Sequence, residues 1–163
     1  MENYTIIVAG QVKFGKLTFL QHIGDYPVIS FLPPFGNRSL MRIPIDADLD
    51  LYIGRVPESG ALVDFMHVIM QSAIGFIVFV DSSAPERFRE ARGILGALLA
   101  HYFVPLIVAA NKQDLPEAWS PEDLRIALRI PKSIPIVPCV ATDHASVRQV
   151  LLTLLGCVLA ESE

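Results

Sequence analysis

Four short apolar runs, rich in β-branched residues, alternate with amphipathic segments along this chain. The runs cover residues 5–9, 75–80, 106–110 and 134–140. Uninterrupted apolar runs of this length are typical of strands buried on both faces of a parallel sheet. The alternation predicts an α/β fold, a doubly wound, mostly parallel sheet of about six strands with helices on both faces. A length of 163 residues allows one such domain, which we assign to residues 1–163.

The segments between these runs carry helix and turn signals. Residues 85–101 have apolar side chains at helical spacing. Residues 120–128 begin with a Ser cap and a Pro at the first helical position, and residues 146–159 predict a closing helix. Residues 27–39 are crowded with prolines and predict an irregular surface loop, whereas residues 40–54 predict a hairpin near the sheet edge.

Directly after the first run, the chain reads GQVKFGKLT, which nearly matches the phosphate-binding pattern GxxxxGK[ST]. Gly10 and Gly15 allow close approach of the backbone to a phosphate, and Lys16 can reach the β- and γ-phosphates. Thr18 can begin the helix whose N-terminus faces the phosphate. A strand, this loop and a helix predict a P-loop NTPase; the alternative is a strand-to-helix turn that keeps the geometry alone.

Two residues of this loop depart from the pattern. Leu17 stands where a hydroxyl is needed for magnesium, and its isobutyl group supplies no hard oxygen ligand. Thr18 carries a hydroxyl one residue later, but it points about 100° further round a helix. Lys13 either adds positive charge beside the phosphates or crowds the site. The sequence therefore predicts a nucleotide-binding loop with a defective magnesium site.

A second motif follows the third run, where residues 111–114 read NKQD, the NKxD base-recognition sequence of GTP-binding proteins. The Asp114 carboxylate can accept hydrogen bonds from N1 and N2 of guanine, a pair of donors that adenine does not present. The aliphatic stem of Lys112 can lie along the base, and Asn111 can tie this loop to the phosphate loop. The two motifs together predict GDP or GTP as the cofactor; NKQD alone could be a polar strand-end turn.

With both motifs in this order, the chain resembles the small GTPases of the Ras and ADP-ribosylation-factor superfamily, most closely a bacterial branch with relatives in gliding and polarity switching. The resemblance covers nearly the whole chain and is carried by GQVKFGK, GFIVFVDSSAPERFREAR, NKQDL and IPIVPCVATD. It implies that CVATD forms the last nucleotide loop, with Ala141 and Thr142 as binding residues and the N–H of Ala141 facing the guanine oxygen. It also implies protein partners, such as roadblock-type or longin-like proteins.

The chain departs from this superfamily in its switch regions. Residues 28–41 offer Ser30 and Ser39 but no switch Thr, and residues 54–66 contain neither an assignable γ-phosphate glycine nor a water-orienting Gln. Phosphoryl transfer depends on positioned metal and electrostatic stabilisation, so hydrolysis is predicted to be slow by orders of magnitude. We assign no catalytic and no metal residue, and we interpret His67 as a surface or packing residue rather than a substitute base.

Three functions are compatible with these motifs. The main hypothesis is a guanine-nucleotide-binding Ras-like protein with weak or absent GTP hydrolysis that acts through protein partners. The alternative is a pseudo-GTPase, a scaffold or interaction module that no longer binds nucleotide. The third is an ordinary GTPase whose missing elements come from unusual residues or from a partner.

Composition narrows the remaining classes. A net charge of −4 and a pI near 5.5 argue against nucleic acid as a partner. The apolar segments fall short of the roughly 20 residues that span a bilayer, and no signal-peptide pattern precedes the first strand. With Cys139 and Cys157 as its only cysteines, the chain is expected to be a cytoplasmic protein with reduced thiols and no transmembrane segment.

Other residues receive structural interpretations. Asp81 is expected to cap the turn after the second run, and Cys139 to be a buried thiol at the end of a strand. Arg87, Arg89 and Arg92 are interpreted as solvated charges on the polar side of the helix of residues 85–101 rather than as an arginine finger. Phe103 and Trp119 are expected to pack beneath loops.

Overall fold

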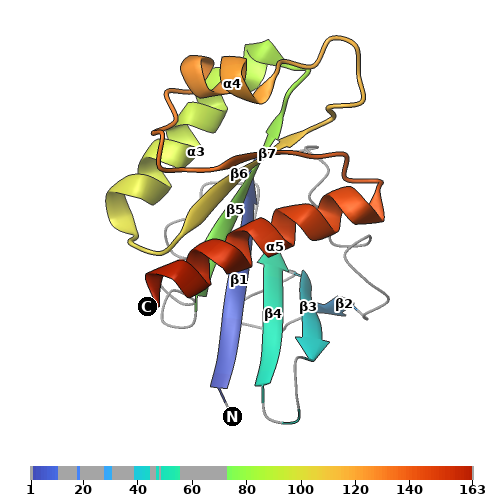
Figure 1. Cartoon of the computed structure of the whole chain (residues 1–163), viewed down its shortest axis with the longest axis vertical. Helices are drawn as coiled ribbons and strands as arrows, with labels where there is room; N and C mark the ends of the chain where they lie inside the picture. The colour runs from blue at the N-terminus through green and yellow to red at the C-terminus, as the bar shows by residue number, and fades with distance from the viewer. Residues whose placement is uncertain are drawn as a thin grey trace.

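The computed structural model describes residues 2–10, 18, 28–30, 39–44, 47, 49–55 and 73–162 of the chain. Its seven described strands form one sheet in the order β2-β3-β4-β1-β5-β6-β7 (Figure 1). They are β1 (Glu2–Gly10), β2 (Val28–Ser30), β3 (Ser39–Pro44), β4 (Leu49–Arg55), β5 (Ala73–Asp81), β6 (Leu106–Asn111) and β7 (Ile136–Pro138). The described sheet exceeds the predicted six strands because of β2, a short strand at one edge.

In the described sheet, the neighbouring strands β4, β1, β5, β6 and β7 run parallel. Strand β3 is antiparallel to β4, and β2 is antiparallel to β3. The mostly parallel sheet and the edge hairpin of residues 40–54 are therefore confirmed. The prediction of irregular structure for residues 27–39 is wrong for β2, where the β-branched residues Val28 and Ile29 pair with β3.

The described helices are the 3-10 turn η1 (Pro85–Arg87) and the helices α3 (Phe88–His101), α4 (Pro121–Ala127) and α5 (His144–Glu161). Ser120 caps α4 as predicted, because its Oγ accepts a hydrogen bond from the N–H of Asp123 at 3.2 Å. Helix α5 begins earlier than the predicted residue 146. Its cap is Asp143, whose Oδ2 accepts a hydrogen bond from the N–H of Ser146 at 3.2 Å. None of these described helices combines the length and apolarity needed to cross a bilayer.

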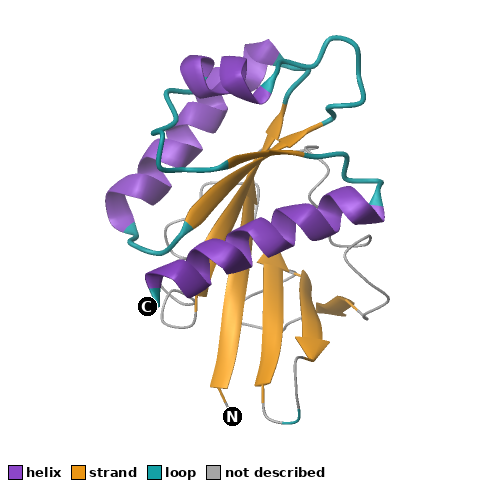
Figure 2. Ribbon diagram, in the orientation of Figure 1, coloured by secondary structure: helices purple, strands orange, loops and turns teal. Residues whose placement is uncertain are grey.

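Helices cover both faces of the sheet, as predicted (Figure 2). Helix α5 lies on one face, and α3 and α4 lie on the other. Along β5, Phe76 and Val78 pack with α3 and α4, whereas Ile77 and Phe79 pack with α5. Because both faces are buried, β5 has no polar residue until its last position, Asp81.

Of the two aromatic residues expected to pack beneath loops, Trp119 is packed and Phe103 is exposed. Trp119 packs edge-on against Phe88, with ring centroids 5.0 Å apart. Phe103 is 92% exposed, so its predicted packing is wrong. The neighbouring Tyr102 takes the inward position, with its ring centroid 5.6 Å from that of Phe76. Since the backbone of Tyr102 is extended, the next side chain points to the opposite side.

Candidate functional site

The candidate site lies at the carboxyl edge of the parallel strands, where β1, β5 and β6 end (Figure 1). Ligands of open α/β sheets commonly bind at this edge. Strand β1 ends at Gly10, whose φ of 149° is a conformation that L side chains rarely adopt. A glycine is therefore needed where the predicted phosphate loop leaves the sheet.

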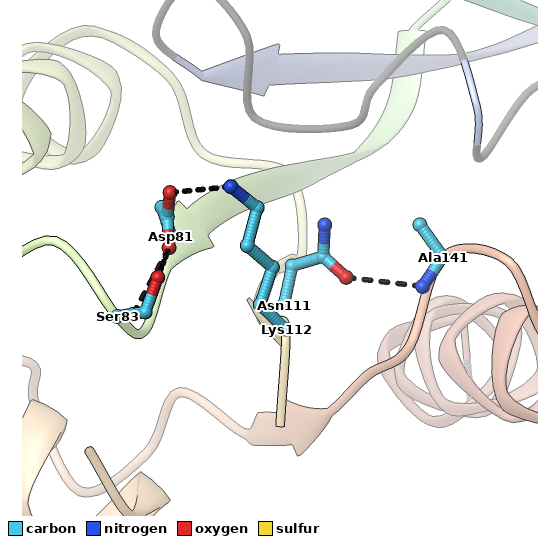
Figure 3. Close-up of polar contacts among 5 residues, drawn as sticks. All are labelled: Asp81, Ser83, Asn111, Lys112 and Ala141. Carbon is cyan, nitrogen blue, oxygen red and sulfur yellow. Dashed lines mark hydrogen bonds and ion pairs between the residues drawn. The ribbon is translucent and has the colours of Figure 1, made fainter. Parts of the chain in front are cut away.

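Asn111, the first residue of NKQD, ends β6 and is 3% exposed. Its Oδ1 accepts a hydrogen bond from the N–H of Ala141 at 3.0 Å (Figure 3). This bond joins NKQD to the CVATD loop. The family resemblance implies that the same N–H faces a guanine oxygen. In the structure this N–H donates to Asn111, so a base contact would require the donor to be shared.

Lys112 extends from the same loop toward the end of β5 (Figure 3). Its Nζ lies 2.9 Å from Oδ2 of Asp81. The other carboxylate oxygen, Oδ1, accepts hydrogen bonds from the N–H and the Oγ–H of Ser83 at 2.9 and 2.6 Å. Asp81 caps its turn, as predicted, and also anchors the NKQD loop.

The electrostatic environment of Asp81 combines opposing effects. Burial of the carboxyl raises its pKa. Hydrogen bonds from Lys112 and Ser83, together with the positive charge of Lys112, outweigh burial and hold the pKa of Asp81 below its usual value. Asp81 is therefore ionised at neutral pH and forms a true ion pair with Lys112.

The NKQD loop keeps its shape through bonds within the protein. The backbone of Lys112 is left-handed, with φ of 64°, and such a conformation costs on the order of 1 kcal/mol for a residue with a side chain. The Nε2 of Gln113 donates to Oγ of Ser82 at 2.8 Å and to the carbonyl of Trp119 at 2.9 Å. The N–H of Leu115 donates to the carbonyl of Lys112 at 3.1 Å. The loop is thus preformed.

A cavity of about 300 Å³ opens beside this loop. It is lined by Thr18, Asn111, Lys112, Asp114, Leu115, Val140, Ala141 and Thr142. The helical residue Thr18 therefore lines the same cavity as residues of the NKQD and CVATD loops. Among the described residues, none pairs with the carboxylate of Asp114, which is exposed. The apolar side chains of Leu115 and Val140 beside this carboxylate suit a flat heterocycle that presents N–H donors.

Several predicted site residues lie outside the described part of the chain. These are Lys13, Gly15, Lys16 and Leu17. His67, which we interpret as a surface or packing residue, also lies outside the described part. The loss of a magnesium ligand at Leu17 therefore stays a prediction. Within the ranges that the structure describes, no group of three or more His, Cys, Asp or Glu side chains is arranged to hold a metal ion.

Sequence reasoning gave Asp81, Leu115 and Val140 no role in this site. A signal for Asp81 was present, because it ends one buried run just as Asn111 ends the next, and neighbouring parallel strands bring such ends together. The structure pairs Asp81 with Asn111 in the register of β5 and β6. Leu115 and Val140 each flank a motif residue, but only the fold reveals that both line one cavity.

Comparison with known proteins gives consistent matches. The sequence profile of the ADP-ribosylation factor family matches residues 2–157. Similar proteins include two from Mus musculus, ADP-ribosylation factor-like protein 14, which is 25% identical over 131 residues, and ADP-ribosylation factor-like protein 4D, which is 27% identical over 132 residues. ADP-ribosylation factor-like protein 9 of Homo sapiens is 28% identical over 131 residues. The alignments cover 78%, 76% and 79% of this chain and 68%, 66% and 69% of these relatives, respectively. The chain therefore spans about two thirds of the length of each relative.

Proposed function

This chain belongs to the ADP-ribosylation factor family of small GTPases, and from that membership we propose that it binds GDP or GTP, hydrolyses GTP weakly or not at all, and acts through protein partners. The observation that carries the nucleotide assignment is the position of Asp114. Its carboxylate has no partner among the described residues and lines a cavity whose other walls come from the predicted nucleotide loops. A carboxylate in this position can select guanine.

Several of the lining residues have assigned roles in this proposal. Asp114 accepts hydrogen bonds from N1 and N2 of guanine, and the aliphatic stem of Lys112 borders the base. Ala141 shares its N–H between Asn111 and the guanine oxygen. Thr18 lies on the phosphate side, where the helix N-terminus and the phosphate loop that starts at Gly10 favour negative charge. The remaining loop residues, Lys13, Gly15 and Lys16, are assigned to the phosphates from the sequence alone.

Weak hydrolysis follows from the sequence rather than from the cavity. Leu17 supplies no oxygen ligand for magnesium, and no switch Thr or water-orienting Gln is recognisable. A bound magnesium ion would neutralise the charge that develops on the transferred phosphoryl group. We therefore expect guanine-nucleotide binding to depend little on magnesium and GTP turnover to be very slow.

Isothermal titration calorimetry with GDP, GTP and ADP, with and without magnesium, tests the binding proposal. Wild-type protein should bind GDP and GTP but not ADP. Asp114→Asn should weaken GDP binding by about ten-fold or more, because one charge-assisted hydrogen bond of roughly 1.5–3 kcal/mol is lost. The amide of Asp114→Asn can instead donate to the 2-oxo group of xanthosine diphosphate, so binding of that nucleotide should strengthen.

Glu117→Gln is the matched control, since Glu117 is an exposed acid of the same loop that does not line the cavity. It should leave GDP affinity unchanged. Failure of wild-type protein to bind GDP or GTP at millimolar concentration would end the binding proposal. Multiple-turnover phosphate release measured with and without magnesium tests hydrolysis. Fast, magnesium-dependent phosphate release would contradict the proposal that GTP hydrolysis is weak or absent.

One observation favours the alternative function, a pseudo-GTPase scaffold. The ammonium of Lys112 and the N–H of Ala141 already have partners within the protein, in Asp81 and Asn111. A scaffold would keep these bonds as purely structural contacts. Under this alternative, Asp114→Asn and wild-type protein would both leave GDP and xanthosine diphosphate unbound while remaining equally folded.

The partner proposal concerns the segment YPVISFLPPF, which includes Phe31 and Phe35 and follows the predicted phosphate-binding helix. Exposed apolar segments are candidate interfaces. Roadblock-type or longin-like proteins are the partners proposed from the family resemblance. A pull-down with purified candidates should lose its signal when Phe31 and Phe35 are both replaced by Ser, and unchanged recovery would contradict this choice of interface.

A further inference from the structure

A second cavity, of about 220 Å³, lies between α3 and the turn that follows α4. We call it the α3–α4 hollow. Its apolar floor comes from Leu95 and Leu99 of α3 and from Leu128 and Ile130 after α4. Leu99 remains 39% exposed, so an apolar surface is open to solvent at this point.

Gly96 of α3 lines the α3–α4 hollow. A Cβ built on Gly96 would meet no described heavy atom within 4 Å outside its own helix backbone. The opposite wall is held in place by Arg125, whose guanidinium donates to the carbonyl oxygens of Pro131 at 2.6 Å and Ile134 at 3.0 Å. The hollow is therefore preformed rather than created by a moving loop.

Two arginines from different elements flank this apolar floor. Arg92 comes from α3 and is partly exposed, and Arg129 follows α4. Neither guanidinium has a hydrogen bond or ion pair with a described residue, and none of the described lining residues is acidic. Arg129 also has a left-handed backbone, with φ of 54°, which a residue with a side chain seldom adopts. The hollow is therefore flanked by positive charge, although the whole chain has a net charge of −4.

We propose that the α3–α4 hollow binds an acidic peptide segment of a partner protein, with one apolar side chain in the hollow and carboxylates on Arg92 and Arg129. The volume decides against a small-molecule cofactor, because such pockets usually measure about 300–1,000 Å³. A single aliphatic side chain fits the space, and charge-assisted hydrogen bonds from guanidinium groups fit flanking carboxylates.

Titration of the ¹⁵N-labelled full chain with capped tripeptides tests this proposal. Acetyl-Glu-Leu-Glu-amide should shift the backbone amide of Gly96 and the Nε–H signals of Arg92 and Arg129 at peptide concentrations up to about 10 mM, the range for a weak single-anchor ligand. Acetyl-Lys-Leu-Lys-amide and acetyl-Glu-Ser-Glu-amide should bind at least ten-fold more weakly. No shift with the first peptide, or equal shifts with the basic one, would overturn the proposal.

Two variant pairs separate binding from folding. Gly96→Leu should fill the hollow and abolish the shifts, whereas Gly93→Leu, on the same helix and also with open space, should not. The Arg92→Gln and Arg129→Gln double variant should weaken binding at least ten-fold, whereas Arg89→Gln, an exposed charge outside the hollow, should not. Peptide shifts that survive Gly96→Leu would overturn the proposal. Concentration-dependent self-association that Gly96→Leu removes would identify a second copy as the occupant and overturn it equally.

Discussion

The Nζ atom of Lys112 lies 2.9 Å from Oδ2 of Asp81, across the ends of two neighbouring parallel strands. This ion pair links the NKQD loop to the turn after β5. Because the side chain of Asp81 is 7% exposed and that of Lys112 39% exposed, the pair is only partly screened by water. It therefore preorganises the loop that carries Asp114, and preorganisation lowers the cost of binding.

Asp81→Asn is expected to destabilise the protein by about 1–3 kcal/mol, less than the 3–5 kcal/mol lost on breaking a fully buried pair, because Lys112 keeps access to water. Urea unfolding followed by the fluorescence of Trp119, the only tryptophan, measures this change. Ser83→Ala is the control, since it removes a neutral donor and leaves the ion pair intact. An equal loss for both variants would contradict a specific contribution of the ion pair.

The contribution of Asp81 should depend on pH in a defined direction. Its pKa is lowered in the folded protein, so its stabilisation is fully present above the unfolded-state pKa of about 3.9 and disappears as pH falls through the folded value. The difference in unfolding free energy between wild type and Asp81→Asn should therefore be constant from pH 7 to about 5 and shrink below about pH 4. Other carboxyls cancel in this difference. If this difference in unfolding free energy instead grew toward low pH, the pKa of Asp81 would be raised in the folded protein rather than lowered.

Much of the arrangement of strands, helices and the NKQD loop follows from local sequence signals. Ser120 before Pro121 fixes the start of α4, because side-chain capping depends on neighbouring residues alone. The NKQD loop could be placed at the carboxyl edge because the buried run before it has to be a strand. The spacing of apolar residues and the capping residues therefore predict the layers of sheet and helices and the position of the NKQD loop.

Other features depend on contacts between distant segments. The inward position of Tyr102, which leaves Phe103 exposed, is set by packing on Phe76 of another strand. The ion pair between Asp81 and Lys112 depends on which strands are neighbours in the sheet. The α3–α4 hollow is likewise invisible in the sequence, since an isolated Gly96 in a helix indicates only reduced helix propensity.

The two thiols should differ sharply in reactivity. Cys139 is 1% exposed, and burial together with the charge of Asp143 raises its pKa to about 11 despite a hydrogen bond with Ser146. At pH 8 only about one molecule in a thousand then carries the thiolate. Iodoacetamide should label the half-buried Cys157 first and Cys139 only after unfolding, as peptide mass spectrometry would reveal. Comparable rates for both in native protein would contradict this order.

Gly75 in β5 and Leu154 in α5 set the distance between the sheet and its covering helix. A Cβ on Gly75 would lie 2.9 Å from Cδ1 of Leu154 and 3.2 Å from the carbonyl oxygen of Pro105. Leu154 is fully buried and the carbonyl belongs to the backbone, so neither can move away cheaply. Gly75→Ala should therefore destabilise the protein by about 1–3 kcal/mol in urea unfolding.

The same substitution at Gly93 provides a control of opposite sign. A Cβ there meets no described heavy atom within 4 Å outside its own helix backbone, so Gly93→Ala should stabilise α3 by about 0.5–1 kcal/mol. Leu154→Ala alone should cost about 2–5 kcal/mol, because it leaves a cavity. Combined with Gly75→Ala, it should cost less than the sum, since the clash with Leu154 is gone and only the contact with Pro105 remains. Additive costs would place the strain of Gly75→Ala at Pro105 rather than at the packing of α5.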